Sequence, residues 1–372
     1  MRGGRIVALL ALTCAGLVLP AGAGWARTGE VTSTSPPAVL GTPRFDSPAT
    51  ADPGSWSPEP ESTTYQWLVD GEPVAGATGP SYTPRLGDIG HGLSVTVTAS
   101  TTGFSPGTRT SEARTVRRGL FRDATVRLQG TPRFGHALAL DSFTATPTPD
   151  SRSLTWVRDR RAIAGQTERR HRIAVADVGH RVGLRVTARR TGYAPLVVTS
   201  ATPRVGHRTP VRHSVTYHVE TRGRISADVA AFKRLAQATY DDPRGWRGGG
   251  VAFRRVARGG DLTLVLAEAS WLPRFSSQCS AQWSCRVGRF VVINQTRWQH
   301  ASQMWHRTGG SLRAYRHMVV DHETGHWLGH HHATCPARGA LAPVMQTQSK
   351  GLDGCRPNPF PVAAEWRSAW RR

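Results

Sequence analysis

The sequence predicts a multidomain protein in which two all-β sandwiches precede an α+β domain with a mixed sheet and helices. Three observations predict this architecture. The sequence is duplicated between residues 37 and 205, and each copy contains short runs in which apolar and polar residues alternate. After residue 208, apolar residues recur three and four positions apart, as on one face of a helix. A chain of 372 residues has room for two or three domains. We place the domains at residues 37–118, 125–205 and 208–372.

The N-terminus has the pattern of a secretory signal peptide over residues 1–26. Arg2 and Arg5 precede an apolar run from Ile6 to Leu19, and small residues follow it. The run is short for a membrane span, which needs about 20 apolar residues. We therefore expect export, cleavage and a mature chain without a membrane span. Its expected location is extracytoplasmic, either secreted or associated with the cell envelope.

The two copies of the duplication keep a constant offset of 89 residues. "YQWLVDGEPVAGAT" around Trp67 returns as "LTWVRDRRAIAGQT" around Trp156, and His91 recurs as His180. Alternating runs punctuated by Gly, Pro, Asp and Ser are typical of small antiparallel sandwiches. The copies resemble the immunoglobulin-like repeats of bacterial surface and secreted proteins, which implies sandwiches with Trp67 and Trp156 in their cores. Neither copy contains a cluster of residues that could bind a metal or act as nucleophiles. We therefore interpret the two histidines as structural and the repeats as spacers or adhesive modules.

The net charge of +23 at pH 7 does not by itself indicate a nucleic-acid-binding protein. Arginine outnumbers lysine by 46 to 2, and the arginines are scattered through every segment instead of gathering on one helix. We therefore expect no nucleic acid partner. Exposed positive charge favours an anionic cell-envelope polymer instead.

The last domain changes from short strands to a mixture of strands and helices. Apolar residues spaced three and four apart indicate two helices; Ser226 is a candidate cap for the first, and the second runs from Ser311 toward Gly329. The expected strands cover residues 213–220, 251–256, 262–267 and 289–294, and a closing helix is expected around Trp366. This order of elements favours a mixed domain of strands and helices.

The helix that follows Ser311 carries the strongest functional motif of the chain. His322 and His326 lie four residues apart on one helical face, so both imidazoles can reach a single ion. Glu323 lies beside the first of them, and H-E-x-x-H is typical of zinc hydrolases. Gly329 can end the helix, so that the chain turns back and His332 supplies a third imidazole. The sequence therefore predicts one catalytic Zn²⁺ with three histidine ligands and Glu323 as general base.

The full pattern H-E-x-x-H-x-x-G-x-x-H resembles the metzincin clan of zinc endopeptidases over roughly residues 208–372. The resemblance implies a methionine-containing turn beneath the metal, for which Met345 in "APVMQTQS" is the candidate, and a protein or peptide substrate. Within the clan, "YRHMVVDHETGHWLGHHHATCP" and "PVMQTQSKGLDGC" resemble an uncharacterised domain family of exported proteins from high-GC Gram-positive bacteria. The chain departs from some metzincins because it has no tyrosine after Tyr315 and no cysteine-switch pro-segment.

Four cysteines follow the signal segment, and in an exported protein they predict two disulfides with three alternative pairings. These cysteines are Cys279, Cys285, Cys335 and Cys355. They lack the C-x₂-C spacing of structural zinc sites. Two histidines, His330 and His331, are left over by the metal motif. We expect them to be exposed, the alternative being that one of them supports the site from outside the ligand set.

The function predicted from these patterns is that of a secreted zinc-dependent endopeptidase, which hydrolyses peptide bonds with a zinc-activated water. An alternative is an envelope-binding or adhesion protein whose zinc domain is structural or inactive. A third interpretation is metal scavenging by the histidine cluster. The intact Glu323 favours the enzyme, because a purely structural zinc site needs no general base.

Overall fold

The computed structural model describes residues 29–372, and the expected signal peptide at residues 1–26 lies outside the described residues. The chain forms two compact units, one running up to Phe121 with Arg189–Pro195 added, the other comprising Arg122–Ala188 and Leu196–Arg372. The second unit contains two separate hydrophobic cores, one for the second repeat and one for the C-terminal domain. Within residues 29–372, no helix has both the length and the apolar character needed to cross a bilayer. The expected boundaries of three domains stay a prediction.

The first repeat is a β-sandwich in which two sheets enclose Trp67, and a separate two-stranded sheet pairs β1 with β4. One sheet has the strand order β2-β3-β7 and the other β10-β8-β5-β6, with β9 also paired to β8. The core combines Val39 and Ala51 from the first sheet with Trp67 and Leu93 from the second. The strands are β1 (Thr32–Ser35), β2 (Ala38–Val39), β3 (Ala49–Asp52), β4 (Ser55–Ser57), β5 (Ser62–Val69), β6 (Glu72–Pro73), β7 (Ser81–Tyr82), β8 (Gly92–Ser100), β9 (Gly107–Thr110) and β10 (Arg114–Thr115).

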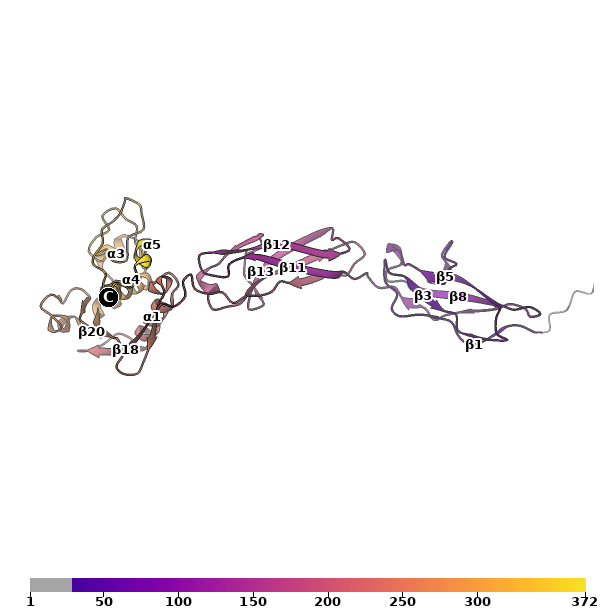
Figure 1. Ribbon diagram of the computed structural model, residues 1–372, viewed down its shortest axis with the longest axis horizontal. Coiled ribbons are helices and arrows are strands. Elements are labelled where there is room, and N and C mark those ends of the chain that lie inside the picture. The colour runs from indigo at the N-terminus through magenta and orange to yellow at the C-terminus, as the bar shows by residue number, and fades with distance from the viewer. Residues whose placement is uncertain (1–28) are drawn as a thin grey trace, which may run out of the picture. The chain divides into compact units, whose positions relative to one another are not determined.

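The second repeat is also a β-sandwich, with sheets of order β11-β12-β15 and β14-β13-β16-β17. Trp156 is fully buried between them, as Trp67 is in the first repeat. Alternation places the apolar side chains of each strand on the inner face. The strands, three of which are labelled in Figure 1, are β11 (Arg122–Gly130), β12 (Ala137–Thr146), β13 (Ser151–Arg158), β14 (Arg161–Ala162), β15 (Arg170–Arg172), β16 (Val182–Arg189) and β17 (Leu196–Thr199).

The two recurring histidines of the repeats have structural partners at a hairpin turn. His91 Nδ1 lies 2.6 Å from Asp70 Oδ2, and His180 Nδ1 lies 2.6 Å from Asp159 Oδ2. Both aspartates have positive φ angles, 50° and 46°, which their short polar side chains tolerate in turns. Each histidine therefore holds a turn carboxylate, which agrees with the structural interpretation.

A buried aspartate shows how the duplicated repeats have diverged. In the second repeat, the Asp177 carboxylate is fully buried and lies 2.8 Å from both His171 Nε2 and Arg158 Nε. The equivalent Asp88 of the first repeat accepts a hydrogen bond from the Tyr82 hydroxyl at 2.7 Å. Burial opposes the ionisation of Asp177, but hydrogen bonds from His171, a backbone N–H and Arg158 outweigh it and lower its pKa to about 2.

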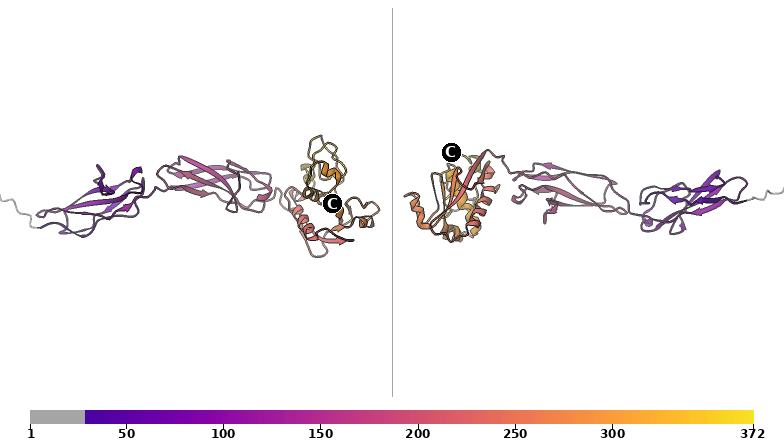
Figure 2. Two further views of the ribbon diagram at one scale, coloured as in Figure 1. Left: turned by 180° about the vertical axis from the view of Figure 1, so that it is seen from behind. Right: turned by 90° about the horizontal axis from the view of Figure 1, so that it is seen from below.

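The C-terminal domain packs helices against a five-stranded mixed sheet of order β19-β18-β20-β22-β21. The first four of these strands run parallel, and the edge strand β21 runs antiparallel to β22. Figure 2 shows the α-helices of the described residues in the salmon-to-yellow part of the chain. The strands are β18 (His213–Arg222), β19 (Val251–Arg255), β20 (Leu262–Ala267), β21 (Cys285–Val287) and β22 (Phe290–Asn294), and the helices are α1 (Val229–Asp241), α2 (Gln295–His300), α3 (Gln303–Arg307), α4 (Leu312–Trp327) and α5 (Ala363–Arg367).

Helices α1 and α4 position the functional motif because they pack against each other and α4 also packs against β22 and β21. Their apolar faces share one core with the sheet, in which Phe232, Leu264 and Val320 are fully buried. Parallel strands that are buried on both faces are nearly continuous apolar runs, and β20 is such a run apart from Thr263. Helix α4, which carries the motif, is therefore held by α1 and by the strands β22 and β21 at one edge of the sheet.

One detail of the predicted helices is wrong. The cap of α1 is Asp228 instead of Ser226, because the Asp228 carboxylate accepts the N–H of Ala231 at 2.9 Å. The closing helix expected around Trp366 is present as α5, and the residue that it buries is Glu365. The contacts of Glu365 belong to the functional site described below.

Candidate metal centre

Helix α4 delivers two of the candidate ligands because its ends are well defined. Ser311 caps its start and accepts the N–H of Ala314 at 3.1 Å. At its other end Gly329 has a φ of 94°, a left-handed conformation that glycine adopts without strain. The N–H of His330 then donates to the carbonyl of Gly325 at 2.9 Å, which closes the last turn. The chain can reverse directly after the motif.

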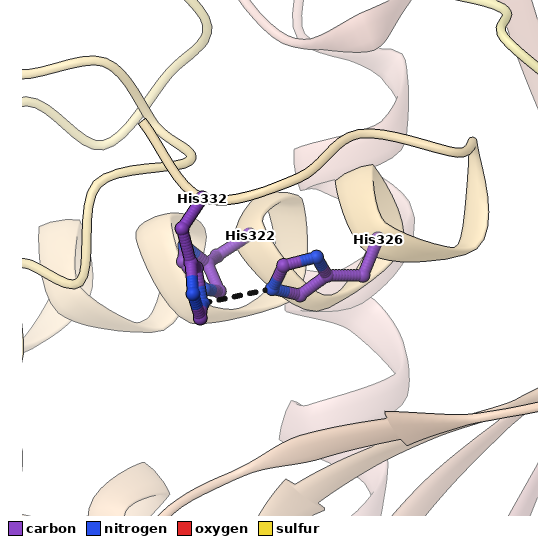
Figure 3. A group of neighbouring side chains, drawn as sticks. All are labelled: His322, His326 and His332. Atoms are coloured by element: carbon purple, nitrogen blue, oxygen red, sulfur yellow. Dashed lines mark hydrogen bonds between the residues drawn. The ribbon is translucent and has the colours of Figure 1, made fainter. Parts of the chain in front are cut away.

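Three imidazoles converge at this reversal. Figure 3 shows His322 and His326 on the helix and His332 on the segment that runs back along it, with the three rings facing one another. One ring nitrogen from each histidine lies within 4.8 Å of the others, and His326 Nε2 and His332 Nε2 are 3.1 Å apart. Two nitrogens bound to one tetrahedral zinc at 2.0–2.1 Å would be about 3.3 Å apart. The donor set, and the spacing of the pair formed by His326 and His332, therefore fit a single zinc ion.

The main chain orients both helix histidines. His322 Nδ1 lies 2.7 Å from the carbonyl oxygen of Val344, and His326 Nδ1 lies 2.9 Å from that of His330. A carbonyl only accepts, so Nδ1 donates in both rings and each Nε2 keeps its lone pair for the centre. Burial is the main cause that lowers the pKa of His322 to about 3 and lowers that of His326. Both rings are therefore neutral at pH 7, the form that binds zinc.

Glu323 lies beside the three histidines in a cleft of about 470 Å³. It is only 6% exposed, and this burial raises the pKa of its carboxyl to about 8, against the opposing charge of Arg286. A general base must lie within reach of the water that it deprotonates. The position of Glu323 beside the three histidines suits a general base.

Met345 lies under α4 in close contact with the motif. It is 1% exposed, and a methyl group added at Gly325 would lie 2.2 Å from Met345 Sδ. The glycine between the glutamate and the second histidine of the motif therefore allows this methionine to reach the helix. Met345 also follows Val344, whose carbonyl holds His322. The turn thus supports the first ligand through its backbone.

Glu365 of α5 supports the same turn, and sequence reasoning missed it. Its carboxylate accepts the N–H of Val344 at 3.1 Å and that of Met345 at 2.9 Å, and it also accepts the N–H of Val362 at 2.7 Å. Burial raises its pKa, while these backbone hydrogen bonds lower it. The available clue was the position of Glu365 three residues after the helix cap, where a capping glutamate is common. Trp366 and Trp370 lie four residues apart and drew attention to an apolar helix face instead of to Glu365.

The two surplus histidines differ in their environments. His331 is exposed, but His330 is only 4% exposed and its ring lies 4.7 Å from that of Trp246. The expectation that both are exposed is therefore wrong for His330. Its ring packs in the core, and its backbone carbonyl, not its side chain, supports the ligand His326.

Both predicted disulfides are present in the structure. The bridges are Cys279–Cys285 and Cys335–Cys355, which is one of the three pairings that the sequence left open. The first closes a loop that forms one wall of the cleft, and the second closes a loop that contains Met345. The cleft walls also bring in Trp283, Arg286 and Lys350, which sequence reasoning did not single out.

Comparison with known proteins yields one family and several distant structures. Residues 181–360 match a family described as "Protein of unknown function (DUF3152)". No curated protein matches the chain. The description of the family names no activity, so the resemblance to metzincins stays a prediction.

Three similar solved structures share 13%, 14% and 15% identity with the chain. One holds three N-terminal domains of the highly immunogenic outer capsid protein of bacteriophage RB49, with 14% identity over 50% of this chain and 66% of that chain, and a TM-score of 0.22. Another is a D1–D4 ectodomain fragment of ICAM-5, with 13% identity over 45% of this chain and 52% of that one, and a TM-score of 0.24. The tandem Ig repeats of Dlar match at 15% identity over 45% of this chain and 96% of that chain, with a TM-score of 0.14. We draw nothing about function from scores this low.

Proposed function

We propose that the C-terminal domain is a zinc-dependent endopeptidase. The observation that carries the proposal is the convergence of the nitrogens of His322, His326 and His332 beside the buried carboxyl of Glu323. A purely structural site usually has four protein ligands, whereas three histidines leave a position open to a cleft. The open position and the adjacent base support a hydrolytic role over a structural one.

In the proposed hydrolysis, the three histidines, Glu323 and two backbone carbonyls have separate roles. A Zn²⁺ bound by the three histidines supplies Lewis acidity, which polarises a carbonyl and makes a water more acidic. Glu323 accepts the proton of the attacking water and returns it to the departing amine. The carbonyls of Val344 and His330 keep two of the ligands in the correct tautomer throughout.

The remaining features support a role outside the cytoplasm. Disulfides persist in oxidising compartments, and the C-terminal domain has two of them. Together with the expected signal peptide, they support a secreted or envelope-associated enzyme. The two sandwiches would then act as spacers or adhesive modules, and the high positive charge would attract an anionic envelope polymer.

Metal analysis and a peptide digest test the proposed function. The purified chain is expected to hold one tightly bound zinc and to cleave members of a peptide library, with cleavage abolished by a chelator and restored by zinc. Glu323→Gln should keep the zinc and lose at least 100-fold in kcat/KM, because a positioned base contributes about 10²–10⁴-fold. His322→Ala should lose both zinc and activity.

Other results would favour the alternatives. One tightly bound zinc without cleavage of any peptide would support an envelope-binding or adhesion protein with an inactive zinc domain. Several weakly bound ions would support metal scavenging. Full activity in the Glu323→Gln variant would exclude the proposed mechanism.

A further inference from the structure

The cleft around the candidate metal centre has an unusual charge composition. Among the described residues that line it, Glu323 is the sole acidic residue, and it lies at the centre itself. Two cations, Arg286 and Lys350, come from different walls. The described residues form no ion pair with either cation, although other arginines of this domain, such as Arg222 and Arg244, have carboxylate partners. Their charge is therefore available to a ligand.

The edge strand β21 presents Arg286 to the cleft. Its neighbours on both sides, Cys285 and Val287, pack against the small apolar cluster beneath the strand. Because successive side chains of a strand point to opposite faces, Arg286 extends away from that cluster. Its positive charge opposes the protonation of Glu323 and adds to the effect of burial in lowering the pKa of His326. Arg286 thus acts on the metal centre from the sheet side.

Lys350 reaches the cleft from a different segment, the loop closed by the Cys335–Cys355 disulfide. Its N–H donates to the carbonyl of Thr347 at 2.8 Å, within the segment that the Cys335–Cys355 disulfide closes. Its Nζ lies 6.0 Å from the ring centre of Trp283, which belongs to the loop closed by the other disulfide. Burial is the main cause that lowers the pKa of His322 and His332, and the charge of Lys350 adds to it in both. The two disulfide loops therefore meet at a cation and an aromatic ring.

Trp283 is itself fixed in position. The guanidinium of Arg297 lies 4.9 Å from its ring centre, and Arg297 Nε donates to the carbonyl of Gln282 at 2.9 Å. A flat aromatic surface with cations on both walls suits a peptide segment with one negatively charged group. Positively charged segments are repelled by the same two cations, and a bound zinc would add to this repulsion.

We propose that this cleft selects peptides that carry a carboxylate close to the scissile bond, and that Lys350 and Arg286 bind that carboxylate. The inference rests on the proposed endopeptidase function and adds its substrate class. Guanidinium and ammonium groups form strong, charge-assisted hydrogen bonds to carboxylates. The carboxylate belongs either to an acidic side chain or to the C-terminus of the peptide, and the experiment separates the two sources.

Matched peptides test the proposed selection. A library peptide that is cleaved serves as the parent, and glutamate, glutamine or lysine replaces each residue flanking the cleaved bond in turn. A second pair compares a free C-terminal carboxylate with its amide. We expect kcat/KM to be roughly tenfold higher for glutamate than for glutamine at one position, or for the free acid than for the amide, as one hydrogen bond to a charged group provides.

Two pairs of variants identify the residues responsible. The double variant Lys350→Gln with Arg286→Gln is expected to reduce the tenfold preference to about one. The matched control combines Lys233→Gln, the only other lysine of the chain, with Arg254→Gln on the opposite edge strand β19, and neither residue lines the cleft. The control should keep the preference.

Binding without turnover separates the inference from the proposed function. In the Glu323→Gln background, the acidic peptide should bind roughly tenfold more tightly than its neutral analogue, and raising the salt concentration should reduce the difference. Cleavage or binding that is indifferent to the carboxylate at every position overturns the inference and leaves the endopeptidase proposal intact. A preference that survives in the cleft double variant also overturns it. Failure to cleave any peptide overturns both.

Discussion

The support that Glu365 gives to the metal site can be tested by removing one oxygen. In Glu365→Gln, the side chain keeps its size but replaces one carboxylate oxygen with an amide N–H₂ group. In the native chain the Val344 N–H donates to Oε2 and the Met345 N–H donates to Oε1, so the amide nitrogen of glutamine replaces one of these two acceptors. At least one of these buried N–H groups then faces another donor. The turn that holds His322 must shift or lose a hydrogen bond.

The size of the effect follows from the burial of the site. A hydrogen bond to a charged group contributes about 1.5–3 kcal/mol, and a buried donor left without a partner costs a similar amount. Glu365 is 7% exposed, so solvent can replace little of this loss. We expect the free energy of unfolding of the C-terminal domain to fall by about 2–3 kcal/mol. Zinc affinity should fall by about 10–100-fold, as for other residues that orient a ligand from outside.

Chemical denaturation and zinc competition with a chromophoric chelator measure the two quantities. Glu268→Gln is a matched control, because Glu268 also accepts one backbone N–H, that of Arg224 at 2.8 Å, but does not line the cleft. The control should lose some stability and no zinc affinity. If Glu365→Gln were destabilised but bound zinc as tightly as the unaltered chain, the link from α5 through the methionine turn to His322 would be refuted.

Three further predictions concern other contacts. Gly325→Ala should destabilise the domain by about 1–3 kcal/mol in denaturation experiments, although alanine normally favours a helix, because the added methyl would lie 2.2 Å from Met345 Sδ; equal or greater stability would contradict the packing. The folded pKa of Asp177, about 2, lies below its ordinary value of 3.8, so its ionised form stabilises the second repeat above pH 4, and about 2 kcal/mol is lost as the pH falls from 4 to 2. Hydrogen exchange of β13 and β16 should show this loss in the unaltered chain and not in Asp177→Asn. Replacing Cys335 and Cys355 by serine opens a loop with a sequence separation of 20 and should lower the free energy of unfolding by about 3 kcal/mol. Zinc affinity, measured by competition with the same chelator, should also fall. Unchanged zinc affinity would show that the loop does not order the site.

Local patterns in the sequence were sufficient to predict that His322, His326 and His332 lie together. His322 and His326 share one helix face because they are four residues apart, and Gly329 can end the helix because glycine adopts a left-handed conformation. Both inferences depend only on residues within a few positions of one another. The duplication likewise revealed the two sandwiches, because an 89-residue offset requires no knowledge of the fold.

Contacts between distant segments could not be predicted in this way. Glu365 contacts the methionine turn about 20 positions away, and Arg286 and Lys350, which are far apart in the sequence, both line the folded cleft. The burial of His330 depends on Trp246, which lies in another part of the domain. Ser226 and Asp228 are both good helix caps, and tertiary packing decides between them. Spacing and composition in a single sequence do not reveal contacts between residues that are distant along the chain.

The carbonyls that orient His322 and His326 belong to the peptide backbone at Val344 and His330. No exchange of a side chain at either position can delete those acceptors directly. The centre should thus tolerate varied amino acids at 344 and 330, provided that they fit, and should fail when a residue is inserted or removed nearby. Chain length between Gly329 and Met345 is therefore under tighter constraint than residue identity.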